Sequence, residues 1–139
     1  MQSHLKQSEH NIALVKFIDV ELADNYFDWR ITILFYAALH LLKAWFVFKG
    51  IKRETNSHNE LFAGLDSSNA TSKARLPEKE YSQYYCLYQL SRTARYQSCY
   101  QSDNQKALLK YSLIQARSYY NEISKFLQSQ GMDIKKDLL

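Results

Sequence analysis

The sequence has few of the residues that interrupt or cross-link a chain. Its 139 residues include only three glycines, one proline and two cysteines. Because glycine and proline supply most tight turns, their scarcity argues against a many-stranded β protein and favours long helices. The two cysteines, Cys86 and Cys99, would lie about 20 Å apart on one helix, which is too far for a disulfide. The polar start MQSHLKQSEHN does not resemble a secretory signal, so we expect reduced cysteines and a cytoplasmic protein.

The motifs that identify common enzymes are also missing. The sequence has no glycine-rich phosphate loop, no Walker pattern and no nucleophile elbow. No histidine pair stands at metal-ligand spacing, and no carboxylate pair stands at catalytic spacing on one predicted helix. We therefore expect neither a metal nor a cofactor.

The net charge of the chain is small, but its basic and acidic residues are unevenly distributed along the sequence. The formal net charge is +4, well short of a dedicated nucleic-acid coat. Residues 1–30 contain three basic and five acidic residues, whereas residues 84–120 contain five basic and one acidic residue. An anionic partner is therefore expected on the second half of the chain.

The longest apolar stretch runs from Asp28 to Lys49 and is apolar on nearly every side. Such a helix is either a membrane span or the buried centre of a helical protein. Its polar residues, however, recur in four-residue steps along one side, where a bilayer would penalise them. This polar seam consists of Asp28, Thr32, Tyr36 and His40, with Lys43 beside them. We predict a core helix that turns the seam toward a cleft or a second subunit, and no membrane association.

Apolar periodicity and terminal signals predict a single all-α domain, an antiparallel bundle of four long helices and one short helix. The predicted helices begin near Ser3, Asp24, Ser57, Glu78 and Ser102 and end near Ala23, Gly50, Gly64, Tyr100 and Gly131. The last one carries a heptad-like apolar seam: Leu109, Leu113, Ala116, Tyr120, Ile123 and Leu127. Residues 66–77 are predicted to be a flexible surface loop. Alternatively, Lys73 and Arg75 of this loop contact a phosphate backbone. Residues 132–139 are predicted to be a frayed tail.

The first candidate site pairs Arg53 with His58 just before the short predicted helix. Amides at a helix N-terminus attract anions and disfavour a protonated histidine. His58 could therefore act as a base on a 2′-hydroxyl while Arg53 holds the phosphate. The alternative is an incidental pair on a surface loop.

The second candidate site gathers basic and aromatic residues of the later helices. Two arginines one turn apart can clamp a phosphate, and a neighbouring tyrosine can stack on a base. The alternative is that these arginines form ion pairs with the acidic first helices. The residues are Tyr88, Arg92, Arg95, Tyr96, Lys106 and Lys110.

The third candidate is the polar seam itself, of which Asp28, Tyr36 and His40 are the members that can carry chemistry. A histidine inside an apolar helix can act directly on a substrate, or it can be a hydrogen-bonded core residue that specifies the packing. The sequence leaves both readings open.

Four segments together resemble the HEPN superfamily (higher eukaryotes and prokaryotes nucleotide-binding): SEHNIALVKFID, YFDWRITILFYAALHLLKAWF, SHNEL and LYQLSRTARYQ. The resemblance implies a four- or five-helix bundle that often forms homodimers. Many members are metal-independent ribonucleases of toxin–antitoxin, CRISPR or other defence systems, and others are inactive RNA-binding or partner-binding modules, some working beside nucleotidyltransferases. The family's catalytic arginine and histidine match only Arg53 and His58, although Glu54 replaces the usual residue and the pair precedes a short helix.

Three hypotheses follow. The chain is a HEPN-like module that binds RNA or a nucleotide through a basic groove, within a defence or toxin–antitoxin type system. Alternatively, it is a metal-independent ribonuclease using Arg53 and His58, or a non-catalytic dimerisation module. A nucleotidyltransferase-type partner protein is expected from the resemblance.

Overall fold

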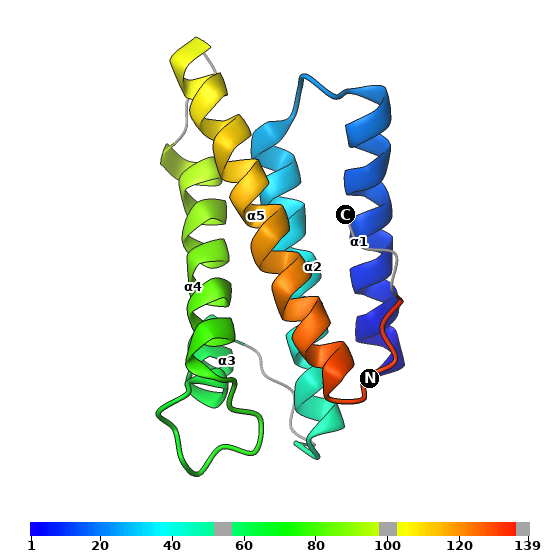
Figure 1. Cartoon of the computed structure of the whole chain (residues 1–139), viewed down its shortest axis with the longest axis vertical. Helices are drawn as coiled ribbons and strands as arrows, with labels where there is room; N and C mark the ends of the chain where they lie inside the picture. The colour runs from blue at the N-terminus through cyan, green and yellow to red at the C-terminus, as the bar shows by residue number, and fades with distance from the viewer. Residues whose placement is uncertain (52–56, 98–102, 136–139) are drawn as a thin grey trace.

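The computed structural model describes residues 1–51, 57–97 and 103–135, and these residues form helices joined by turns, with no strand among them. The all-α prediction is therefore confirmed, with four long helices and one short one side by side in a bundle (Figure 1). The elements are α1 (Gln2–Glu21), α2 (Phe27–Phe48), α3 (His58–Leu65), α4 (Glu78–Arg92), a π-helical turn (Thr93–Gln97) and α5 (Asp103–Ser129).

The apolar helix α2 occupies the centre of the bundle and packs against α1, α4 and α5 (Figure 1). Among the described residues it is the one helix long and apolar enough to cross a membrane, with a mean hydropathy of 1.8. Most of its apolar stretch is buried within the bundle, as in the core helix of a soluble protein.

The predicted seam of α5 is confirmed, since all six of its apolar residues are buried in the core. That burial makes the seam part of this chain's own core, so it offers no surface to a partner. Gly131, with a φ of 100°, follows the end of α5 as expected, and Met132 directly after it is buried. Gly50, with a φ of 85°, follows α2 in the same way.

Several helix ends differ from the prediction. Ser3 lies inside α1 and does not cap it. Ahead of α2, Tyr26 adopts a left-handed conformation with a φ of 57°, and its amide donates to Oδ1 of Asn25. The helix predicted to continue to Tyr100 changes to a π-helical turn after Arg92, and residues 98–102 lie outside the described part. π-helical turns are rare and are frequent at functional sites.

One carboxylate joins three helices. Asp19 of α1 accepts a hydrogen bond of 2.9 Å from Arg30 of α2 and another from Arg117 of α5. Arg30 is only 3% exposed, and it also donates to the carbonyls of Ala23 and Asn25. Burial raises the pKa of Asp19, but the bonds to Arg117 and Arg30 outweigh burial and bring the pKa below its usual value.

We predict that Asp19→Asn lowers the free energy of unfolding by about 2–4 kcal/mol, because it leaves the buried Arg30 without a counter-charge. Since the folded-state pKa of Asp19 is lowered, the wild-type stabilisation is present above the unfolded pKa and is lost as the pH falls through the folded one. Urea unfolding across acidic pH measures both effects. Glu122→Gln, which removes the exposed pair with Lys79, should change stability by less than about 1 kcal/mol.

Candidate functional site

The polar seam of α2 meets the π-helical turn through Tyr36 and Arg95. Nη1 of Arg95 donates to the hydroxyl of Tyr36 at 3.0 Å, and the guanidinium lies 5.6 Å from the centre of the tyrosine ring. Arg95 is also held by Ser91, whose carbonyl and hydroxyl accept at 3.3 and 3.4 Å. Because Ser91 is fully buried and these bonds come from Nε and Nη2, the guanidinium itself is held against the bundle. The π-helical turn therefore presents Arg95 in one defined position.

His58, the first residue of α3, lies beside these groups. The hydroxyl of Ser57 caps α3 by accepting from the amide of Glu60 at 3.1 Å, which is half of a capping box. Burial lowers the pKa of His58, and the nearby cations Arg95 and Lys43 lower it further. Near neutral pH the imidazole is therefore uncharged and available as a base or a hydrogen-bonding group.

Tyr88 of α4 completes the arrangement. Its ring centre lies 5.5 Å from those of His58 and Phe35, and the guanidinium of Arg92 lies 5.7 Å above it. We call the group that these contacts connect the His58–Arg95 cluster, and we add Lys43 to it because its charge lowers the pKa of His58. Its members are Tyr36, Lys43, His58, Tyr88, Arg92 and Arg95.

The cations of the His58–Arg95 cluster have no acidic partner in the described residues. The ion pairs found there include those of Arg30, Lys79, Arg117 and Lys135, and none involves Lys43, Arg92 or Arg95. The alternative was that Arg92 and Arg95 form ion pairs with the acidic first helices. In the structure Asp19 of α1 pairs with Arg30 and Arg117 instead. Two guanidinium groups and a lysine that lack a counter-charge within residues 1–51, 57–97 and 103–135 form a site that can attract an anion.

His40 belongs to a different contact. Its Nδ1 lies 3.1 Å from Nδ1 of His4 on α1, and the two rings stack at 5.4 Å. Burial lowers the pKa of His40, and the charges of His4 and Lys43 contribute. Further along the seam, the hydroxyl of Thr32 donates to the carbonyl of Asp28 within α2. The residues of the polar seam therefore have different partners. Tyr36 and Lys43 belong to the His58–Arg95 cluster, whereas His40 contacts His4.

Of the other predicted site residues, Tyr96 contacts the cluster at its exposed edge through Arg95. Arg53 and Cys99 lie outside the described residues, and Cys86 is an exposed free thiol. Tyr96 is 74% exposed, with Arg95 5.1 Å from its ring centre. On α5, Lys106 is half-buried and Lys110 is exposed, and neither forms a hydrogen bond with a cluster residue in the described part of the chain.

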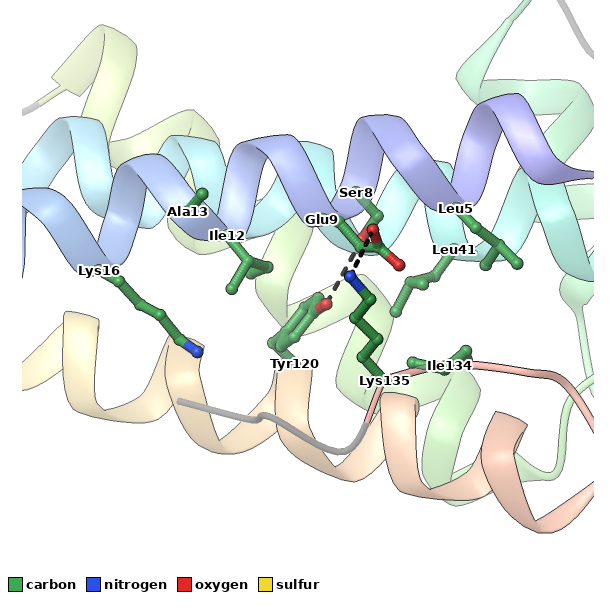
Figure 2. A pocket seen from close by; sticks show the side chains of 10 residues that line it. All are labelled: Leu5, Ser8, Glu9, Ile12, Ala13, Lys16, Leu41, Tyr120, Ile134 and Lys135. Atoms are coloured by element: carbon green, nitrogen blue, oxygen red, sulfur yellow. Dashed lines mark hydrogen bonds and ion pairs between the residues drawn. The ribbon is translucent and has the colours of Figure 1, made fainter.

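Two cavities lie elsewhere in the fold, and the sequence predicted neither. The Tyr120 cavity, of about 220 Å³, opens between α1 and α5 over α2 (Figure 2). The hydroxyls of Tyr120 and Ser8 face each other there at 3.4 Å, and Glu9 pairs with Lys135 at 3.5 Å across its opening. The second, larger cavity lies beside Trp45. Among the described residues, no group of three histidines, cysteines or carboxylates could hold a metal ion.

Compared with models of protein families, with curated proteins and with solved structures, the chain matches none of them. Any function must therefore be argued from the chemistry of its own side chains.

We predict that Arg95→Gln raises the pKa of His58 toward its usual value, because one of the two cations that oppose protonation is removed. Burial and Lys43 remain, so the recovery should be partial. Titration of the histidine ring signals by NMR measures it. Lys125→Gln, at an exposed position of α5, is the control and should leave the titration of His58 unchanged.

Proposed function

We propose that this chain is an antiparallel, HEPN-like helical module that binds RNA or a nucleotide at the His58–Arg95 cluster. The single observation that carries the proposal is the Arg95–Tyr36 contact beside His58, in a group whose cations lack acidic partners in the described part of the chain. A phosphate is the ligand whose charge and acceptor oxygens fit such donors.

The aromatic members of the cluster support a nucleic acid over a simple anion. Tyr88 and Tyr36 each lie beneath a guanidinium, and the exposed ring of Tyr96 is adjacent to Arg95. Alternating cations and rings can follow a single strand, because the backbone contacts the cations while bases stack on the rings. Tyr96 is the ring best exposed for stacking.

The resemblance to HEPN proteins adds the setting. It implies a protein of a defence or toxin–antitoxin type system, with a nucleotidyltransferase-type protein as a candidate partner, while the polar N-terminal stretch is the basis for expecting a cytoplasmic location. The helical bundle is consistent with this assignment, although many unrelated families share such a fold.

A ribonuclease is the second candidate, and the lowered pKa of His58 favours it. An unprotonated His58 could take the proton of a 2′-hydroxyl, whose oxygen would then attack the adjacent phosphorus and expel the 5′-oxygen. Arg95 is the described cation best placed to stabilise the charge that develops on the phosphate, a role that the sequence assigned to Arg53.

One labelled single-stranded RNA tests both candidates. We expect Arg95→Gln to weaken binding about tenfold and to reduce the slope of log affinity against log salt by about one, because one phosphate contact is lost. Tyr36→Phe should have a smaller effect, since it only removes the bond that positions Arg95. Lys125→Gln is the matched control, and equal loss in this variant would indicate diffuse attraction to a basic surface.

The same RNA, incubated at neutral pH and analysed for 2′,3′-cyclic phosphate ends, separates the ribonuclease from the binding module. Cleavage that His58→Ala abolishes while binding persists supports the ribonuclease. An intact RNA that the wild-type protein binds supports the non-catalytic module.

A homodimer is the form in which we expect the protein to act, and exposed apolar side chains support this. Phe17 and Val20 on α1 are 59% and 77% exposed, and three residues along one side of α5 are 60–67% exposed: Leu108, Tyr111 and Ile114. Exposed apolar side chains that lie near one another on a helix can mark an interface. Acidic residues accompany the α1 patch and lysines the α5 patch, so two copies could exchange complementary contacts.

We predict that Val20→Asp and Ile114→Asp each weaken self-association by roughly tenfold, because each places a charge in the interface. Sedimentation equilibrium over a range of concentrations measures the effect. Lys125→Asp lies on the same side of α5 but three turns beyond Ile114, about 16 Å along the helix, so it should change self-association much less if the interface is confined to the patch. A wild-type protein that remains monomeric at high concentration would contradict the homodimer.

A further inference from the structure

A second group of basic residues surrounds the larger cavity, which we call the Trp45 cavity. It has a volume of about 730 Å³ and lies where the end of α2, the segment 66–77, the start of α4 and the end of α5 meet. Small-molecule sites typically have volumes of about 300–1,000 Å³, so a molecule as large as a nucleotide would fit. None of its lining residues belongs to the His58–Arg95 cluster.

The segment 66–77 forms one wall and is attached to the bundle at several points. The indole nitrogen of the buried Trp45 donates to the carbonyl of Ala74 at 2.8 Å, and the amide of Leu76 donates to the carbonyl of Leu65 at 2.9 Å. Ser72 donates to the carbonyl of Gly64, and Ala74 and Leu76 are buried. Despite its low hydrophobicity, this segment is held in place by buried anchors.

These anchors place three cations around the cavity. Lys73 and Arg75 flank the anchored Ala74 and line the cavity, and Lys49 lies on its opposite wall with its ammonium 5.0 Å above the ring of Trp45. Glu78 is the one acidic residue in the lining. In the part of the chain that the structure describes, no carboxylate lies within ion-pair distance of these three cations.

We propose that the Trp45 cavity binds a pyrophosphate group, either free or as part of a nucleoside polyphosphate. Three cations against one carboxylate give the lining a net charge of +2, which would attract a compact polyanion. The hydroxyl of Ser67 adds a hydrogen-bond donor, and Phe126 and Leu76 provide an apolar wall for a base or sugar. This site does not depend on RNA binding at the His58–Arg95 cluster.

Trp45 serves as the probe, because it lies in the cavity wall beneath Lys49. The exposed Trp29, the other tryptophan of the chain, is replaced by Phe so that only Trp45 emits. Inorganic pyrophosphate and ATP are then titrated while the emission is recorded. We expect a saturable change that weakens with salt, and roughly tenfold weaker binding when Lys73 and Arg75 are both changed to Gln.

Two controls in the same background separate this site from the proposed RNA site. Arg95→Gln and Lys125→Gln should both bind pyrophosphate as the parent does, and circular dichroism checks that every variant is folded. Equal affinity for pyrophosphate and ATP indicates recognition of the phosphates alone, whereas tighter binding of ATP indicates contact with the apolar wall as well. The proposal is overturned if neither ligand binds below about 1 mM, or if only Arg95→Gln weakens binding.

Discussion

The structure depends on covering α2, a helix that is apolar on nearly every side. A helix of this kind is stable in water only if neighbours remove its surface from solvent, and α1, α4 and α5 do so. The few polar groups that α2 carries into this environment must then find hydrogen-bond partners. Where those partners lie decides how the rest of the chain is arranged.

Four polar side chains of α2 have hydrogen-bond partners in another element or in α2 itself, although Nε of Arg30 is buried without one among the described residues. Arg30 bonds to Asp19 of α1, and Thr32 bonds within α2. Tyr36 accepts from Arg95 of the π-helical turn, and Trp45 donates to Ala74 of the segment 66–77. The last two bonds place the two basic sites that we propose, so the requirements of the core also determine where cations gather.

The distribution of charge follows from the same arrangement. Asp19 binds both Arg30 and Arg117, which ties the acidic first helix to the basic last one. Among the described residues, the arginines of α4 and the π-helical turn are left with aromatic partners in place of acidic ones. A cation above a tyrosine ring is stabilised without being neutralised, so it can still bind an anion. The excess of basic residues in the second half of the sequence therefore produces a positive electrostatic potential around Arg92 and Arg95.

Residue patterns alone were sufficient for the number and order of the helices, though not for all of their ends, because each pattern depends on neighbouring residues along the chain. Gly50 and Gly131 marked helix ends through their left-handed conformations, and the apolar spacing from Leu109 to Leu127 marked the buried side of α5. The residue types of the candidate site, arginine and tyrosine beside a histidine, were also visible in the sequence.

Only the tertiary structure decided which of these residues meet. His58 lies beside Arg95, 37 positions away, and the polar seam divides between Arg95 and His4. The anchoring of 66–77 was equally hidden, since the indole of Trp45 and two further hydrogen bonds hold a segment whose composition suggests a free loop. Helix formation depends on neighbours along the chain, whereas a binding site depends on side chains that packing brings together from distant positions, and local periodicity carries no record of those contacts.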